Sequence, residues 1–209
     1  TFGLVGGDRA IRHPWRIAQG LAHSWALDIS ATPAASGAPT DERRLVASQL
    51  DAGVGVVATS SSGRLFDAAA AMLGLCLEAT YEAHAAMALE RAASGAGTAV
   101  PSERFDTPVS VFEDLLAHPE LTVGERALRF HVGLASVFAF EVARCARAAG
   151  TTMVGLTGGV AVNRIFGTAL VSRLEAEGFT VLTHRVVPPT DGGLSLGQAW
   201  AARLLGDGA

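Results

Sequence analysis

The sequence predicts an α/β fold with one parallel βαβ unit and several long helices. Two short apolar runs, residues 152–156 and 179–183, flank an amphipathic stretch at 164–177. Strand, helix and strand within about thirty residues are typical of a parallel pair with a right-handed crossover. Residues 125–149 carry apolar side chains at the spacing of a long amphipathic helix. Because 49% of the 209 residues are hydrophobic, the chain can also bury a sizeable core.

The elements before this unit follow from the same patterns. Residues 54–59 are expected to form a short buried strand that leads into a serine-rich turn at 60–63. A helix should follow, because apolar residues recur at helical spacing at Leu65, Phe66, Ala69, Met72, Leu73 and Cys76. Residues 29–42 and 92–108 contain Pro, Gly and Ser and are expected to be loops. Neither is long or charged enough to separate two domains, so residues 1–209 should form a single unit whose last helix spans about 193–205.

The charged residues exclude several classes of function. All 16 residues of the Lys+Arg total are arginine, so the chain cannot supply the lysine of a P-loop, of a protein kinase or of a pyridoxal phosphate Schiff base. The net charge of −4 and the lack of a basic stripe argue against nucleic acid as a partner. The apolar runs are too short to span a membrane. Cys76 and Cys145 lie in apolar helical patterns, which favours reduced core thiols in a cytoplasmic protein.

A glycine-containing turn at residues 157–163 is the first candidate site. Gly158 and Gly159 lie between the strand and the helix of the βαβ unit, where they let a ligand approach the backbone closely. The following helix should supply free N–H groups and the positive end of its dipole. This arrangement suits a nucleotide or another anion. A tight turn without a ligand is the alternative interpretation.

Two further turns carry charged residues. Asp191 precedes the last helix, where it can act as a helix N-cap or as a ligand of a metal ion that needs further partners. Arg64 and Asp67 lie in the first turn of the helix after residues 60–63 and could hold phosphate or ribose; otherwise they form a surface ion pair. His131 and the other histidines in helical patterns are expected to be packing residues rather than ligands.

Six segments in one order give a resemblance to a known family. They are GGDRAIRHPWR (6–16), ATSSSGRLFDAAAAMLGLC (58–76), YEAHAAMALE (81–90), RFH (129–131), LTGGVAVNR (156–164) and VPPTDGGLSLGQA (187–199). This set closely resembles the C-terminal part of the HypF carbamoyltransferase family, the hydrogenase maturation factors. The resemblance implies the C-terminal lobe of the actin, sugar kinase and heat-shock protein superfold (ribonuclease H-like), in a branch shared with tRNA threonylcarbamoyl transferases.

The resemblance also implies a reaction. In that family, carbamoyl phosphate and ATP give carbamoyl adenylate, and the superfold domain passes the carbamoyl group to the C-terminal cysteine of HypE, an acceptor protein in nickel–iron hydrogenase maturation. The resemblance places Gly158, Gly159, Val160 and Asn163 at the adenosine, and Arg64 and Asp67 near the ribose or phosphates. Asp191 matches an aspartate that binds a divalent metal (zinc, iron or magnesium). The resemblance identifies no catalytic residue in this chain.

The sequence departs from the family pattern in two places. The family's histidine-rich metal motif and its first glycine-rich phosphate loops would precede Thr1, so we expect this chain to form one lobe of a two-lobed cleft and to be part of a longer protein. The family's usual Gly-Gln after Tyr-Glu is Ala83-His84 here. Two alternative functions are an O-carbamoyltransferase for a small molecule and a non-catalytic nucleotide-binding fragment.

Overall fold

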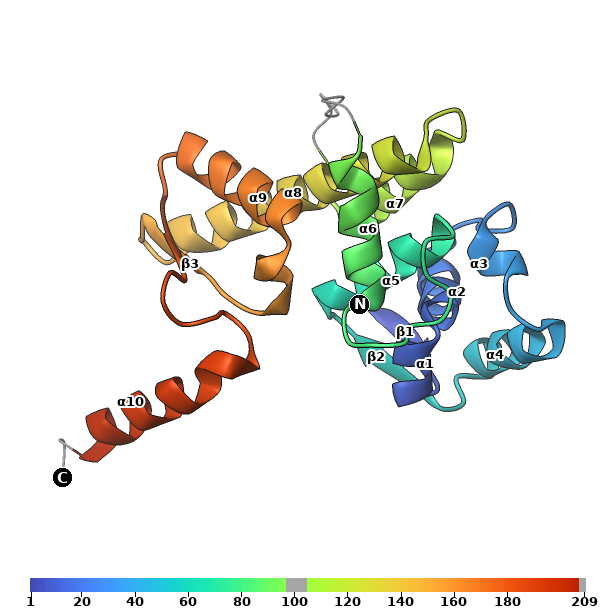
Figure 1. Ribbon diagram of the computed structural model, residues 1–209, viewed down its shortest axis with the longest axis horizontal. Coiled ribbons are helices and arrows are strands. Elements are labelled where there is room, and N and C mark those ends of the chain that lie inside the picture. Colours follow the sequence, from blue (N-terminus) through green and yellow to red (C-terminus); the bar gives the residue numbers. More distant parts are fainter. Residues whose placement is uncertain (97–104, 207–209) are drawn as a thin grey trace.

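The computed structural model describes residues 1–96 and 105–206, which form an α/β structure dominated by helices (Figure 1). Two separate pairs of strands are present in these residues. Strand β1 (Phe2–Val5) pairs antiparallel with β2 (Val56–Thr59), and β3 (Met153–Leu156) pairs parallel with β4 (Thr180–Thr183). Helix α9 (Arg164–Ala176) connects β3 to β4 and completes the βαβ unit that the sequence predicted. Strand β1 was not predicted.

The described residues also form further helices. They are α1 (Asp8–Arg12), α2 (Pro14–Trp25), α3 (Pro33–Ser36), α4 (Thr40–Ala52), α5 (Ser62–Met72), α6 (His84–Ser94), α7 (Pro108–Ala117), α8 (Val123–Ala148) and α10 (Leu194–Gly206), with short 3₁₀ helices η1 (Gly159–Val162) and η2 (Asp191–Gly193). In the described residues no helix is both long and apolar enough to cross a lipid bilayer.

The core lies where α5 is enclosed by α2, α6 and α8. Four phenylalanine rings meet there edge to face: Phe66 of α5 contacts Phe130 and Phe166 at centroid distances of 5.4 and 5.8 Å, and Phe112 contacts Phe130 at 5.4 Å. All four side chains are almost fully buried. Edge-to-face rings add about 0.5–1.5 kcal/mol each to the burial of their apolar surface. This cluster joins α5, α7, α8 and α9 into one packed body.

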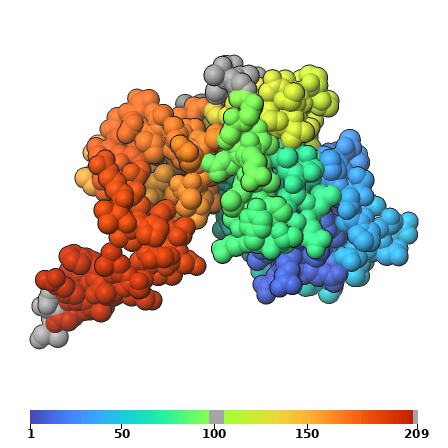
Figure 2. Space-filling view, viewed as in Figure 1, coloured from blue at the N-terminus to red at the C-terminus, as the bar shows by residue number. Residues whose placement is uncertain are grey.

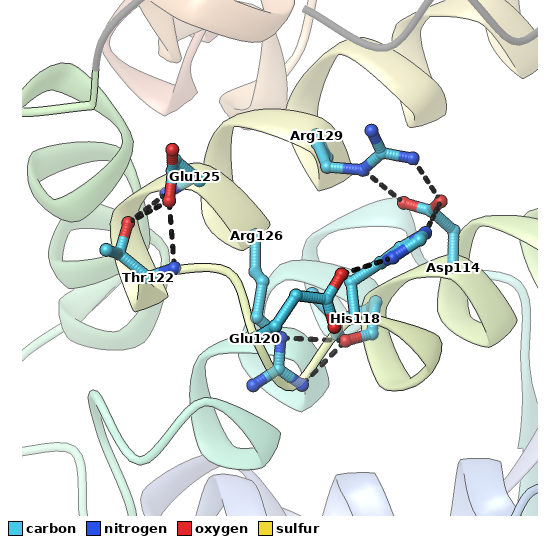
Figure 3. Close-up of polar contacts among 8 residues, drawn as sticks. Asp114, His118, Glu120, Thr122, Glu125, Arg126 and Arg129 are labelled. Atoms are coloured by element: carbon cyan, nitrogen blue, oxygen red, sulfur yellow. Dashed lines mark hydrogen bonds and ion pairs between the residues drawn. The ribbon is translucent and has the colours of Figure 1, made fainter. Parts of the chain in front are cut away.

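The start of α8 is fixed against α7 by polar contacts (Figure 3). The hydroxyl of Thr122 accepts the N–H of Glu125, and the Glu125 carboxylate accepts the N–H of Thr122, which is a reciprocal capping box. One turn further on, Arg129 Nε donates to Asp114 of α7 at 3.0 Å, and His118 Nε2 lies 3.4 Å from the same carboxylate. These contacts set the register in which the apolar face of α8 meets the core.

The C-terminal region of the chain is far less buried. Beyond Phe179, none of the described residues belongs to the buried apolar core, and α10 buries no residue at all. Figure 1 shows α10 extending away from the rest of the molecule, and Figure 2 shows it as a projecting arm. Apolar side chains on this arm remain exposed, among them Trp200 (59%) and Leu205 (79%).

Several sequence predictions need correction. Strand β2 exists, but it is not buried: Val57 is 65% exposed, because within the described residues β2 pairs only with β1 and no helix covers its outer face. Cys76 is buried as expected, whereas Cys145 is exposed, since α8 turns Ala143 and Ala146 toward the core instead. Both cysteines are free thiols.

The two predicted loops also contain helix. Within 29–42, α3 begins at Pro33 and α4 begins at Thr40, since Pro is well tolerated in the first helical turn and Asp41 and Glu42 favour a helix N-terminus. Within 92–108, α6 continues to Ser94 and α7 begins at Pro108. Residues 97–104 of that predicted loop lie outside the described residues.

Candidate functional site

The glycine turn (residues 157–163) joins β3 to α9 and has an open outer side. Gly158 has φ of 95°, a backbone conformation that strongly favours glycine, and its N–H donates to the Pro189 carbonyl at 2.9 Å. Gly159 has no such constraint, and a Cβ added there would meet no atom within 4 Å. Packing within the described chain therefore does not require glycine at position 159, whereas close approach of a ligand would.

The serine turn (residues 60–63) lies beside the glycine turn. It connects β2 to α5, and the Thr59 hydroxyl accepts the N–H of Ser61 at 3.1 Å. A Cβ placed on Gly63 would lie 4.0 Å from the Val160 side chain, which is ordinary van der Waals contact. Two turns almost one hundred residues apart in the sequence thus lie close together, because α5 contacts η1.

Arg64 and Asp67 form an ion pair, but Asp67 is buried rather than at the surface. Arg64 Nη1 lies 3.0 Å from Asp67 Oδ2, and only 5% of Asp67 is exposed. Burial raises the pKa of Asp67 to about 6, because the loss of hydration outweighs the attraction of the Arg64 guanidinium. The alternative of a surface ion pair was therefore wrong: α5 is covered by neighbouring helices on the side that carries Asp67.

Asn163 is buried and forms the N-cap of α9. Its Oδ1 accepts the N–H of Phe166 at 2.9 Å, and its Nδ2 lies 3.0 Å from Nε2 of His131 on α8. The carboxylate of Glu90, from α6, accepts the N–H of Arg164 at 2.7 Å. The prediction of free N–H groups at this helix end was wrong at these two positions, because the chain's own side chains occupy them and bring a negative charge.

Asp191 lies two residues after Pro189, whose carbonyl accepts the Gly158 N–H, and its environment differs from that of Asp67 and Asn163. It is exposed and is the first residue of η2, whose N-cap is Thr190, so the alternative of a helix N-cap was wrong. His184 joins this segment to the glycine turn, with Nε2 3.0 Å from the Thr157 hydroxyl and Nδ1 3.1 Å from the Val187 carbonyl.

The described residues do not by themselves fit a metal ion. Among residues 1–96 and 105–206, no group of three or more His, Cys, Asp and Glu side chains is arranged to hold one. Asp191 offers a single exposed carboxylate, and both ring nitrogens of the nearby His184 already have partners. A divalent cation bound by oxygen needs several ligands, so Asp191 alone is not sufficient.

An open groove runs beside the glycine turn along α9. Its lining residues include Leu156, Ala161, Gly167, Val171 and Thr183. The wall combines apolar side chains with hydroxyl groups, the Asn163 amide and the Arg164 side chain, so it offers both apolar surface and polar groups to a ligand. The groove and the open side of Gly159 are both parts of the same strand-to-helix connection.

Sequence reasoning missed two residues that shape this site. Glu90 and His131 occur in segments that carry the family resemblance, but their partners are at Arg164 and Asn163, far along the chain. His131 was expected to be a packing residue, and it is fully buried with hydrogen bonds at both ring nitrogens. Helical spacing could indicate that His131 is buried, but not which residue it contacts.

Comparison with known proteins connects this geometry to a family. The family described as "Carbamoyltransferase, Kae1-like Domain, second subdomain" matches residues 1–198. Carbamoyltransferase HypF of Rhodobacter capsulatus is 38% identical over 206 residues, which cover 95% of this chain and 26% of that protein.

Solved structures agree with this assignment. The crystal structure of HypF from T. kodakarensis has a TM-score of 0.82 at 28% identity, covering 99% of this chain and 29% of that one. A full-length HypF in its phosphate- and nucleotide-bound form has a TM-score of 0.81 at 26% identity, covering 98% and 28% of the two chains. The chain thus has the Kae1-like fold and spans well under a third of these proteins. It belongs to the HypF carbamoyltransferase family and corresponds to the second subdomain of the Kae1-like domain.

Proposed function

We propose that residues 1–209 act as the C-terminal lobe of a cytoplasmic carbamoyltransferase, one that passes the carbamoyl group of carbamoyl adenylate to the C-terminal cysteine of a HypE-like acceptor in nickel–iron hydrogenase maturation. Family membership supports the carbamoyl chemistry. The observation that carries nucleotide binding is the proximity of the serine turn to the glycine turn, since α5 lies against η1, together with the open space at Gly159. A HypF relative of the same fold in a nucleotide-bound form supports it further.

The proposed roles follow the geometry of the two turns. Gly158, Gly159 and Val160 would line the adenosine pocket. Arg64 and Asp67, at the start of α5, would lie near the ribose or the phosphates. Because the chain has no lysine, its contacts to phosphate would come from backbone N–H groups, hydroxyls and arginine. We assign Asn163 a role in shaping the turn, since its side-chain oxygen and nitrogen already have partners inside the chain.

Asp191 is proposed as one ligand of the divalent metal that the resemblance implies. Its carboxylate is exposed near the glycine turn, through the contact of Gly158 with Pro189. The other ligands would have to come from outside the described residues.

The transfer itself balances without a further reactant. The thiolate sulfur of the acceptor cysteine attacks the carbamoyl carbon, a carbon–sulfur bond forms, the bond from that carbon to the phosphate oxygen breaks, and AMP leaves. The thiol proton goes to solvent or to a base that this chain does not identify. The chain's proposed contribution is to bind and orient the adenylate.

Nucleotide binding is tested by filling the open space at Gly159. Calorimetry on the full-length protein with ADP should show at least about tenfold weaker binding for Gly159→Val, because the new side chain occupies the space proposed for the ligand. Gly155→Val is the matched control: it lies on β3, where an added Cβ also meets nothing within 4 Å, and it should bind ADP as the unmodified protein does. Equal affinity in both variants would remove the glycine turn from the site.

The acceptor is tested separately by mass spectrometry. Carbamoyl phosphate, ATP and a peptide with the C-terminal sequence of HypE should give a carbamoylated cysteine with the full-length protein. A peptide with serine in place of that cysteine serves as the control. Modification of a small-molecule hydroxyl but not of the peptide would favour the O-carbamoyltransferase alternative, and ADP binding without any transfer would favour a non-catalytic role.

A further inference from the structure

Asn163 lies at the junction between the glycine turn and α9. It ends η1 and begins α9, so its side chain determines how the turn enters the helix. Because its Oδ1 accepts the N–H of Phe166, its Nδ2 must point the other way, into the protein. There it meets Nε2 of His131 at 3.0 Å.

The protonation of His131 follows from its two contacts. Nδ1 lies 2.7 Å from the Ala127 carbonyl oxygen, which has no hydrogen to give, so Nδ1 carries the proton. Nε2 is then a bare acceptor for the Asn163 amide, provided that the ring is neutral. Burial lowers the pKa of His131 to about 4, so the ring stays neutral near pH 7.

Packing alone does not account for a histidine at this position. The ring is completely buried and contacts Phe66 and Phe130 edge to face, at centroid distances of 5.4 and 6.0 Å. A leucine or phenylalanine could make such apolar contacts without a buried polar group to satisfy. What histidine adds is an acceptor aimed at Asn163, which selects one of the two orientations of that amide.

We propose that His131 is a positioning residue for nucleotide binding: by holding the Asn163 amide, it fixes the glycine turn in the shape that presents Gly158 and Gly159 to the ligand. The inference rests on the proposed nucleotide site. It links that site to the aromatic core through an unbroken series of hydrogen bonds, from the Ala127 carbonyl through His131 and Asn163 to the Phe166 N–H. His131 itself would not touch the nucleotide.

Two variants of the full-length protein separate positioning from simple stability. Asn163→Ser keeps a good N-cap for α9 but is too short to reach His131. His131→Leu keeps much of the volume and removes the acceptor. For both we expect faster hydrogen exchange of the backbone amides in residues 158–163 and ADP affinity reduced about tenfold, because Asn163→Ser leaves the buried Nε2 of His131 without its donor and His131→Leu leaves the Asn163 amide without its acceptor.

The controls use a conservative replacement and a core variant on the same helix. His131→Gln can place an acceptor oxygen near Asn163 and should restore ADP affinity to within about threefold of the unmodified protein. Val137→Ala, also on α8, should lower the unfolding midpoint without changing exchange in the turn or the affinity of the folded protein for ADP.

The outcomes are distinguishable. If Asn163→Ser leaves both the exchange of residues 158–163 and the affinity for ADP unchanged, the inference is wrong, because capping alone then suffices; this holds even if His131→Leu does not fold. If the unmodified protein does not bind ADP, the proposed nucleotide site fails. The exchange measurement still decides whether His131 holds the turn.

Discussion

The body of the molecule, β1 to α9, and the C-terminal region after Phe179 differ sharply in how they bury apolar surface. The body contains the fully buried rings of Phe66, Phe112 and Phe130, whereas α10 leaves Trp200 and Leu205 more than half exposed. The glycine turn belongs to the body but contacts the C-terminal region through the Gly158 N–H, which donates to the Pro189 carbonyl. Its α9 side is held by buried contacts with His131, while its other side is joined to the C-terminal region by few polar contacts. The α9 side of the turn, which we propose binds the nucleotide, is therefore held by buried contacts, whereas the side that carries Asp191 is not.

The largest expected effect tests this contrast directly. Phe66→Ala should lower the free energy of unfolding by about 3–5 kcal/mol, because it empties the centre of the aromatic cluster. Trp200→Ala, which removes a larger but exposed side chain, should change it by less than about 0.5 kcal/mol. Urea unfolding of the 209-residue chain measures both. Similar losses of unfolding free energy for the two variants would show that α10 is packed against the body as tightly as the aromatic cluster.

The pH dependence of the unfolding free energy tests whether Asp67 and His131 are shielded from water in the body. Burial raises the pKa of Asp67 to about 6 and lowers that of His131 to about 4. Between about pH 4 and 6 the folded state holds a proton on Asp67 that the unfolded state has lost, so this group makes stability fall as pH rises. His131 does the reverse: up to about pH 6.5 the unfolded state holds the extra proton, so stability rises with pH.

These two opposite slopes should nearly cancel in the unmodified protein. Each corresponds to about 3 kcal/mol over the window. Between about pH 4 and 6, the unfolding free energy of Asp67→Asn should therefore rise relative to that of the unmodified protein as the pH increases. That of His131→Gln should fall relative to the unmodified protein over the same range. Urea unfolding at half-unit pH steps measures the slopes. Parallel curves for all three proteins would mean that neither group is closed off from water.

A smaller effect compares the two sides of the glycine turn. Asn163→Ala should cost about 1–2 kcal/mol, because α9 loses its N-cap and the buried Nε2 of His131 loses its donor. Asp191→Ala should cost less than about 0.5 kcal/mol, since that side chain is exposed and Asp191 is not the N-cap of η2. Thermal unfolding of the two variants measures the difference. A larger loss for Asp191→Ala would reverse the assignment of the rigid side.

The sequence predicted the parts of this fold that depend on local pattern. The βαβ unit, the long helix of residues 125–149 and the glycine turn follow from periodicity and from Gly158, and the structure confirms each of them. The burial of Asp67 and the contact of His131 with Asn163 could not be predicted in this way. Both depend on which distant helix covers the residue, and that information is not present in the spacing of one segment.

Backbone strain gives the smallest expected effect. Most left-handed positions among the described residues are glycines, such as Gly158, whereas the alanines Ala26 and Ala83 have φ of 54° and 59°. Position 83 is where the family resemblance places glycine. An alanine there carries about 1 kcal/mol of steric strain that glycine would remove.

Ala83→Gly should therefore stabilise the chain by about 0.5 kcal/mol, since relief of strain outweighs the extra freedom that glycine gives the unfolded chain. Ala26→Gly, at the end of α2, provides the matched comparison, because both alanines are exposed and lose little buried surface. Guanidinium unfolding midpoints resolve such a change. A lower midpoint in both variants would mean that the left-handed backbone at these alanines costs less than the unfolded-state entropy. In that case the departure from glycine at position 83 would carry no stability penalty.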